Sequence, residues 1–158
     1  MMPHVHLLVG LIGTNIFVFG GNNLSYSIYF IIGSVLPDFD YILNLIVKKN
    51  SHRQLPTHFP LIYFLGAFLL GIFGLLPYFW LFIGALIHTF LDVIDWEIYP
   101  FAPFSNRPFT LFNLDYNEVT KEGNIIGFLK LYYKDWKIIF SEILIFFSWI
   151  LSSYINLL

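Results

Sequence analysis

The sequence predicts an all-α membrane protein, a polytopic helical bundle with about five transmembrane helices in a single domain of residues 1–158. Hydrophobic residues make up 58% of the chain and charged residues only 11%, whereas a soluble domain carries about 25% charged residues. The mean hydropathy is +0.73. So few charges cannot cover the surface of a soluble fold, and we therefore expect an integral membrane protein.

Five apolar runs, separated by polar or helix-breaking residues, each predict one helix. The stretch from Val5 to Pro37 has no Lys, Arg, Asp or Glu. It is too long for one span of about 20 residues, and the glycines and asparagines at 20–23 divide it. Pro77 divides the next apolar stretch in the same way. We expect helices at about 5–19, 24–36, 60–76, 78–96 and 138–157.

The chain after the fourth predicted helix has a different composition. Asp95 and Glu97 could each support a metal ligand or act as a general base, but we favour their interpretation as the solvated end of that helix. A stretch rich in proline and phenylalanine follows, and residues 130–137 then interleave lysines with aromatic residues, which is typical of a helix in the membrane interface. We expect residues of about 124–158 to add this segment and a last span to a core of about residues 4–105.

Positive charge predicts the orientation in the membrane. All eight Lys and Arg lie in two loops, 48–59 and 97–137. Cytoplasmic loops carry an excess of these residues, so both loops and the N-terminus are expected on the cytoplasmic side of the cell (inner) membrane. A net charge of −2 predicts no nucleic-acid partner. The absence of cysteine excludes disulfides and thiolate metal ligands.

All five histidines lie in or beside three short polar clusters within the apolar sequence. Ionisable groups are expensive inside a membrane and are functional candidates for that reason. Imidazole and carboxylate are also ligands that bind zinc. With the predicted topology, the candidates from separate segments all lie near the cytoplasmic ends of the helices. The candidate ligands are His6, Asp38, Asp40, His52, His58, His88 and Asp92.

Two of these clusters also have structural interpretations. His88 and Asp92 are four residues apart and share a helix face, so both could reach one ion. They could equally tie helices together through a hydrogen bond. Asp38 or Asp40 could cap a following helix, although capping explains only one of the two. A cation between the two carboxylates would relieve their repulsion.

The other candidates are weaker when each is taken alone. Loop histidines such as His52 and His58 are often only solvated. Arg53 beside them is either a partner for a phosphate or an ordinary charge of a cytoplasmic loop. His4 would face away from His6 on a helix, because two residues turn the helix by about 200°. We therefore expect His6, and not His4, in the site.

The order and spacing of these clusters resemble the predicted membrane-bound metal-dependent hydrolase family that includes YdjM-like inner-membrane proteins. The resemblance covers about residues 4–105, and Gln54 replaces the small residue common after its His-Arg pair. The resemblance implies that the seven candidates are metal ligands. The family is regarded as distantly similar to zinc-dependent phospholipase C and P1-type nucleases, which implies hydrolysis of a phosphoester. The motifs are His6 to Gly10, Leu36 to Asp40, His52-Arg53 with His58, and His88 to Asp92.

The sequence thus predicts a membrane-embedded metal-dependent hydrolase for a small-molecule or lipid phosphoester, such as a lipid head group. Seven ligands exceed the three protein ligands typical of one catalytic zinc, which indicates a dinuclear-type site with zinc or manganese. Asp38 or Asp40 would bridge the metals or act as the base, and Arg53 would steady a phosphate. One alternative is a metal-ion transport or binding protein, although transporters often show internal repeats. The other is a structural protein whose His and Asp only join helices.

Overall fold

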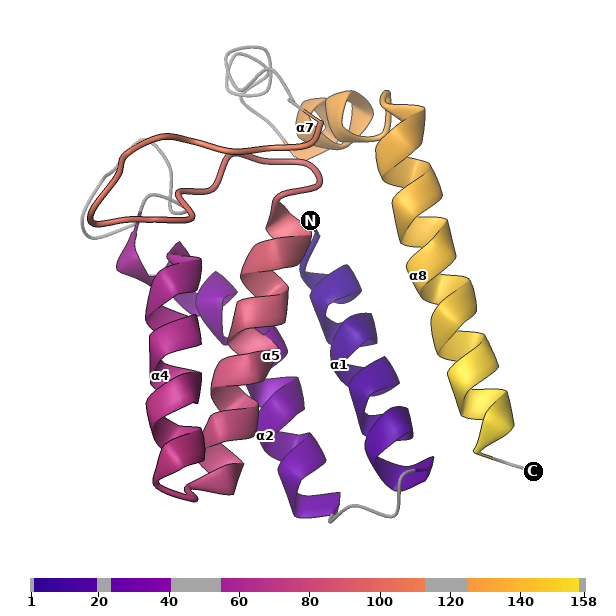
Figure 1. Cartoon of the computed structure of the whole chain (residues 1–158). Helices are drawn as coiled ribbons and strands as arrows, with labels where there is room; N and C mark the ends of the chain where they lie inside the picture. Colours follow the sequence, from indigo (N-terminus) through magenta and orange to yellow (C-terminus); the bar gives the residue numbers. More distant parts are fainter. Residues whose placement is uncertain (1, 20–23, 41–54, 113–124, 157–158) are drawn as a thin grey trace.

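The computed structural model describes residues 2–19, 24–40, 55–112 and 125–156, and they form an all-α fold (Figure 1). All five predicted helices are present. There are also two short 3-10 helices among the described residues. η1 (Leu36–Phe39) follows α2 directly, and η3 (Pro56–His58) lies just before α4. The helices are α1 (Pro3–Phe19), α2 (Leu24–Val35), α4 (Pro60–Ile72), α5 (Leu76–Asp92), α7 (Ile125–Tyr132) and α8 (Trp136–Ile155).

The sequence predicted the turn between α4 and α5 at Pro77, but the turn lies earlier in the chain. α4 ends at Ile72, and Gly74 in the turn has a φ of +68°, a conformation that glycine adopts without strain. Pro77 lies in the first turn of α5. A proline fits there because the first N–H groups of a helix have no partner within the helix.

The predicted end of the fourth helix at residue 96 was wrong, since α5 ends at Asp92. The backbone N–H groups of Asp95 and Trp96 both donate to the carbonyl oxygen of Asp92, at 3.3 and 2.9 Å. This turn carries Asp95 into the protein, where it is 1% exposed. The interpretation of Asp95 as a solvated helix end was therefore also wrong.

α2 and α5 pack backbone against backbone at the centre of the fold. A Cβ atom at Gly33 of α2 would collide with the carbonyl oxygen of Leu81, and a Cβ atom at Gly84 of α5 would collide with that of Phe30. Small residues permit this approach between apolar helices. Because His88 lies one turn after Gly84, the close packing also fixes the distance of its side chain from α2.

We expect Gly84→Ala to lower the free energy of unfolding by about 1–3 kcal/mol, as overpacking does. The added methyl group would meet backbone atoms, which cannot move aside as a side chain can. Thermal unfolding in detergent measures the effect. Gly71→Ala on α4 is the matched control, because its Cβ atom would have an ordinary 3.4 Å contact with the Phe79 ring. An equal loss in both variants would contradict the packing argument.

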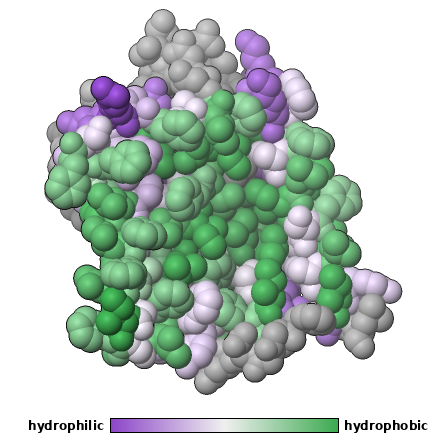
Figure 2. Space-filling model, in the orientation of Figure 1, coloured by the Kyte–Doolittle hydropathy of each residue, from purple (hydrophilic) through white to green (hydrophobic). Residues whose placement is uncertain are grey.

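α8 is the one helix of the described residues that is long and apolar enough to cross a membrane. It has 20 residues, and a stretch of 18 of them has a mean hydropathy of 1.9. It lies beside α1 (Figure 1). The Asn15 side-chain amide joins the two helices by donating to the hydroxyls of Ser152 and Ser153, both at 2.9 Å. The other four long helices are also apolar but have 10–17 residues. Figure 2 shows hydrophobic residues over the helices and hydrophilic ones mainly toward the upper end.

A buried tyrosine joins α7 to α8. The Tyr132 hydroxyl donates to Oε1 of Glu142 at 2.8 Å. Burial, with help from Asp95 and Glu142, raises the pKa of Tyr132 above its ordinary value, so the phenol stays protonated and keeps donating. Nε2 of His4 lies 3.8 Å from Oε2 of the same glutamate. His4 therefore belongs to this contact between α1 and α8.

Candidate metal centre

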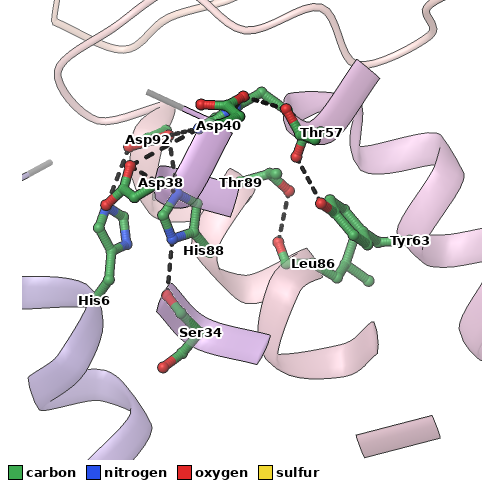
Figure 3. A network of polar contacts seen from close by, with 11 residues as sticks. His6, Ser34, Asp38, Asp40, Thr57, Tyr63, Leu86, His88, Thr89 and Asp92 are labelled. Atoms are coloured by element: carbon green, nitrogen blue, oxygen red, sulfur yellow. Dashed lines mark hydrogen bonds and ion pairs between the residues drawn. The ribbon is translucent and has the colours of Figure 1, made fainter. Parts of the chain in front are cut away.

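Five of the seven predicted ligands meet at the upper end of the bundle, although they come from four separate segments of the chain (Figures 1 and 3). The segments are α1, η1, η3 and the last turns of α5. Asp40 lies beside this group. His52 and Arg53 lie outside the described residues, and their roles stay predictions. The five residues are His6, Asp38, His58, His88 and Asp92.

The carboxylates of Asp38, in η1, and of Asp40, the residue directly after it, lie on opposite sides of the His58 ring. A 3-10 helix has three residues per turn, so side chains two residues apart diverge. Oδ1 of Asp38 lies 4.0 Å from Nε2 of His58, and Oδ2 of Asp40 lies 3.0 Å from Nδ1. Asp38 therefore faces the centre, whereas Asp40 lies behind His58. The segment 41–47, which either aspartate was expected to cap, lies outside the described residues.

The ring nitrogens that face the centre are too far from the carboxylates for good hydrogen bonds. Nε2 of His88 lies 3.5 Å from Oδ2 of Asp92 and 3.6 Å from Oδ1 of Asp38. Nε2 of His6 lies 3.3 Å from Oδ1 of Asp92. Good N–H···O bonds measure about 2.7–3.2 Å. Atoms that are each about 2.0–2.1 Å from a tetrahedral zinc lie about 3.3 Å from one another, so the observed spacing fits ligands around an ion.

The opposite nitrogens of two rings have hydrogen bonds of ordinary length. Nδ1 of His88 donates to the carbonyl oxygen of Ser34 at 2.8 Å, and Nδ1 of His58 contacts Oδ2 of Asp40 at 3.0 Å. A carbonyl oxygen only accepts, so the proton of neutral His88 is on Nδ1 and the lone pair of Nε2 points to the centre. Metal-ligating histidines are held by such bonds through their second nitrogen.

Burial makes this concentration of carboxylates costly unless a cation is bound. The side chains of His6, His58, His88 and Asp92 are 0% exposed, and that of Asp38 is 19% exposed. Nε2 of His88 and Oδ2 of Asp38 have no hydrogen bond within the described part of the chain. Buried polar atoms without partners are rare, and a divalent cation would satisfy both atoms and offset the negative charge.

Sequence reasoning missed the polar groups that stand behind the ligands. The Thr57 hydroxyl donates to Asp40, and the Tyr63 hydroxyl donates to the carbonyl oxygen of Thr57 at 2.7 Å (Figure 3). Thr57 could have been found as the polar residue directly before His58. Ser34 acts through its backbone, so no signal in its side chain points to the role.

The segments that build this centre come from a chain that matches one family model along almost its whole length. The model of the YdjM inner membrane protein matches residues 1–157. The chain belongs to the YdjM inner membrane protein family. The match takes in α7 and α8, beyond the residues 4–105 that carried the resemblance, and the family name supports the expected inner-membrane location. No curated protein and no solved structure matches.

In this YdjM family protein, Asp92 lies between two sets of imidazoles. Its Oδ1 faces His6, and its Oδ2 is 3.5 Å from Nε2 of both His58 and His88. Two groups of three side chains each have their donor atoms within 4.8 Å of one another and could hold an ion: His6 with Asp38 and His88, and His58 with His88 and Asp92. Asp38 is the member of the five with exposed side-chain surface, so water or a substrate would reach the centre past it.

Proposed function

We propose that this YdjM family protein is a membrane-embedded metal-dependent hydrolase acting on a phosphoester, such as a lipid head group. The observation that carries the proposal is the orientation of His88. Its Nδ1 is held by the Ser34 carbonyl, while its Nε2 faces the oxygens of Asp38 and Asp92 at 3.6 and 3.5 Å. A histidine that only joined helices would use short hydrogen bonds to both partners.

The donor set suits zinc, with manganese as the second choice, because imidazole nitrogens and carboxylate oxygens bind both. The five described ligands exceed the three protein ligands of a typical catalytic zinc. We infer that these five residues, together with the predicted ligand His52, would hold two ions. When bound, such ions activate water for attack and stabilise negative charge on a phosphoryl group.

Three side chains would accept a proton, orient a ligand and bind the substrate phosphate. Asp38 is partly exposed and faces the centre, so it can accept the proton of the attacking water. Asp40 holds His58 through Nδ1 and thereby keeps Nε2 directed inward. Arg53 is expected to bind a substrate phosphate through its guanidinium.

We further propose that all five long helices cross the inner membrane, with the metal centre at the cytoplasmic side. The shorter helices would be accommodated by local thinning of the bilayer. The start of α1, the end of α2 with η1, and the end of α5 lie at one end of the bundle (Figure 1). The two basic loops follow η1 and α5 in the sequence.

This orientation predicts the labelling of single cysteines, which the natural chain lacks. A membrane-impermeant maleimide added to intact cells should label Ile155→Cys, at an exposed position in the last turn of α8. It should label Ser105→Cys, in the loop after α5, only after the inner membrane is permeabilised. Labelling of Ser105→Cys in intact cells would overturn the cytoplasmic placement.

The hydrolase proposal is tested with purified protein loaded with zinc or manganese in phospholipid vesicles. We expect release of a phosphorylated head group or of phosphate by the wild type. His88→Ala should lower that rate by at least about 100-fold, and His4→Ala, which removes an imidazole outside the centre, should not. A metal-loaded wild type that cleaves neither lipid nor soluble phosphoesters would sink the proposal. Metal flux into the vesicles without cleavage would favour the transport alternative.

A further inference from the structure

A second site lies beside α5, on the side away from the metal centre. Residues between Phe90 and Leu111 line an open cavity of about 900 Å³, at the upper end of the roughly 300–1,000 Å³ typical of ligand pockets. Phe90 is two residues after His88 and is therefore turned by about 200° around the helix. The cavity and the metal ligands consequently use different faces of the same helix.

The loop that forms the cavity is closed by its own backbone. Ile98 and Phe109 exchange two hydrogen bonds, at 3.0 and 2.8 Å, and the N–H of Leu111 donates to the carbonyl oxygen of Val93 at 2.7 Å. The first two bonds join the two sides of the loop to each other, and the third joins its far end to the residue directly after α5. A pocket held in this way is largely formed before a ligand binds, which lowers the entropic cost of binding.

The lining combines an apolar interior with one cation. Aromatic and aliphatic side chains form most of the wall, and the polar side chains are those of Ser105 and Arg107. Arg107 is exposed, and no acidic group contacts its guanidinium within the described residues. A guanidinium binds a phosphate through two parallel hydrogen bonds. The ligand that fits this wall is an apolar chain with an anionic head.

The exterior of α5 connects the cavity with the apolar surface of the bundle. Phe90 lines the cavity and is also 57% exposed, and Phe101 is 65% exposed. Phe90 lies in the last turn of α5 and Phe101 in the loop that follows it, so in a membrane protein they would lie near the boundary between acyl chains and head groups. An acyl chain could enter beside Phe90 without crossing water, which favours a lipid over a soluble amphiphile.

We propose that this cavity binds one acyl chain of an anionic phospholipid and that Arg107 binds its phosphate. The site requires no hydrolysis and stands independently of the proposed activity. It selects for head-group charge because the lipid's net negative charge lies beside the one cation of the lining. A zwitterionic lipid also carries a phosphate, but its ammonium group would offset the attraction of Arg107.

The test measures phospholipid retained by the full-length protein after detergent exchange, using native mass spectrometry with phosphatidylglycerol or phosphatidylcholine of identical chains. We expect about one phosphatidylglycerol per chain and at least about tenfold less phosphatidylcholine. Arg107→Gln should lower phosphatidylglycerol retention about tenfold, in line with loss of a charged hydrogen bond. Lys134→Gln is the matched control, since it removes an exposed positive charge that does not line the cavity.

A second variant tests the cavity itself. Ser105→Phe would place a ring in the space for the acyl chain, and it should abolish retention while metal content and thermal stability remain those of the wild type. Equal retention of both lipids, or equal losses in the Arg107 and Lys134 variants, would overturn the proposal. So would full retention in Ser105→Phe. None of these results depends on whether a phosphoester is cleaved.

Discussion

Purified protein with Asp92 replaced by asparagine is expected to bind zinc at least about 100-fold more weakly than the wild type. Replacement of a supporting residue beyond the ligands already costs about 10–100-fold in affinity, and Asp92 faces three imidazoles. Its oxygens lie 3.3 Å from Nε2 of His6 and 3.5 Å from Nε2 of both His58 and His88. Metal analysis after dialysis and a competition titration with a chelating dye measure the loss. Glu97→Gln, which removes a carboxylate outside the centre, is the control and should retain the metal.

The same variant separates a metal centre from histidines that only join helices. In a chelator, the proposed site contains closely spaced carboxylates without their cation, so Asp92→Asn should be no less stable than the wild type. Added zinc should then stabilise the wild type by about 2.7 kcal/mol at a free concentration 100 times its dissociation constant, and the variant by no more than about 0.4 kcal/mol. If Asp92 only formed ion pairs between helices, the free energy of unfolding of the variant in the presence of chelator would be about 3–5 kcal/mol lower than that of the wild type. Added zinc would then change the stability of neither protein.

The sequence predicted the five long helices and the meeting of five ligands because both depend on composition. Uninterrupted apolar runs identify the helices, and an ionisable residue in such a run needs a partner. The basic loops then place the ends of several helices on one side. His6 and His88 could be brought together by that argument, although 82 positions separate them in the chain, and their rings stack at 3.7 Å between centroids.

What could not be predicted depends on local turns and on backbone groups. Pro77 has the same local signal whether it ends one helix or begins the next, and only the positive φ of Gly74 places the turn before it. Asp95 is buried because the chain turns directly after Asp92, which no periodicity marks. The carbonyl oxygen of Ser34 reaches His88 because Gly33 and Gly84 let two backbones touch, a contact between distant segments.

Asp40 was predicted as a metal ligand and as a candidate base, and its position behind His58 gives it a different expected effect. We expect Asp40→Asn to weaken zinc binding by about 10–100-fold, as loss of a carboxylate that orients a ligating histidine does. Saturating zinc should then restore the metal content and most of the hydrolytic rate, because the amide oxygen can still accept from Nδ1 of His58. Titration of metal content and rate against free zinc in the same samples gives both values.

Thr57→Val decides between the two roles of Asp40. The Thr57 hydroxyl donates to Asp40, so its loss should act on the proposed metal centre through the orientation of Asp40 and His58. We expect a weaker effect in the same direction, roughly tenfold or less in zinc affinity, again recovered at high zinc. If Asp40 instead bound the metal directly, the hydrolytic rate of Asp40→Asn would not recover at saturating zinc. We expect the same lack of recovery for Asp92→Asn. Unchanged zinc affinity in Thr57→Val, together with an Asp40→Asn rate that does not recover, would show that Asp40 is a metal ligand.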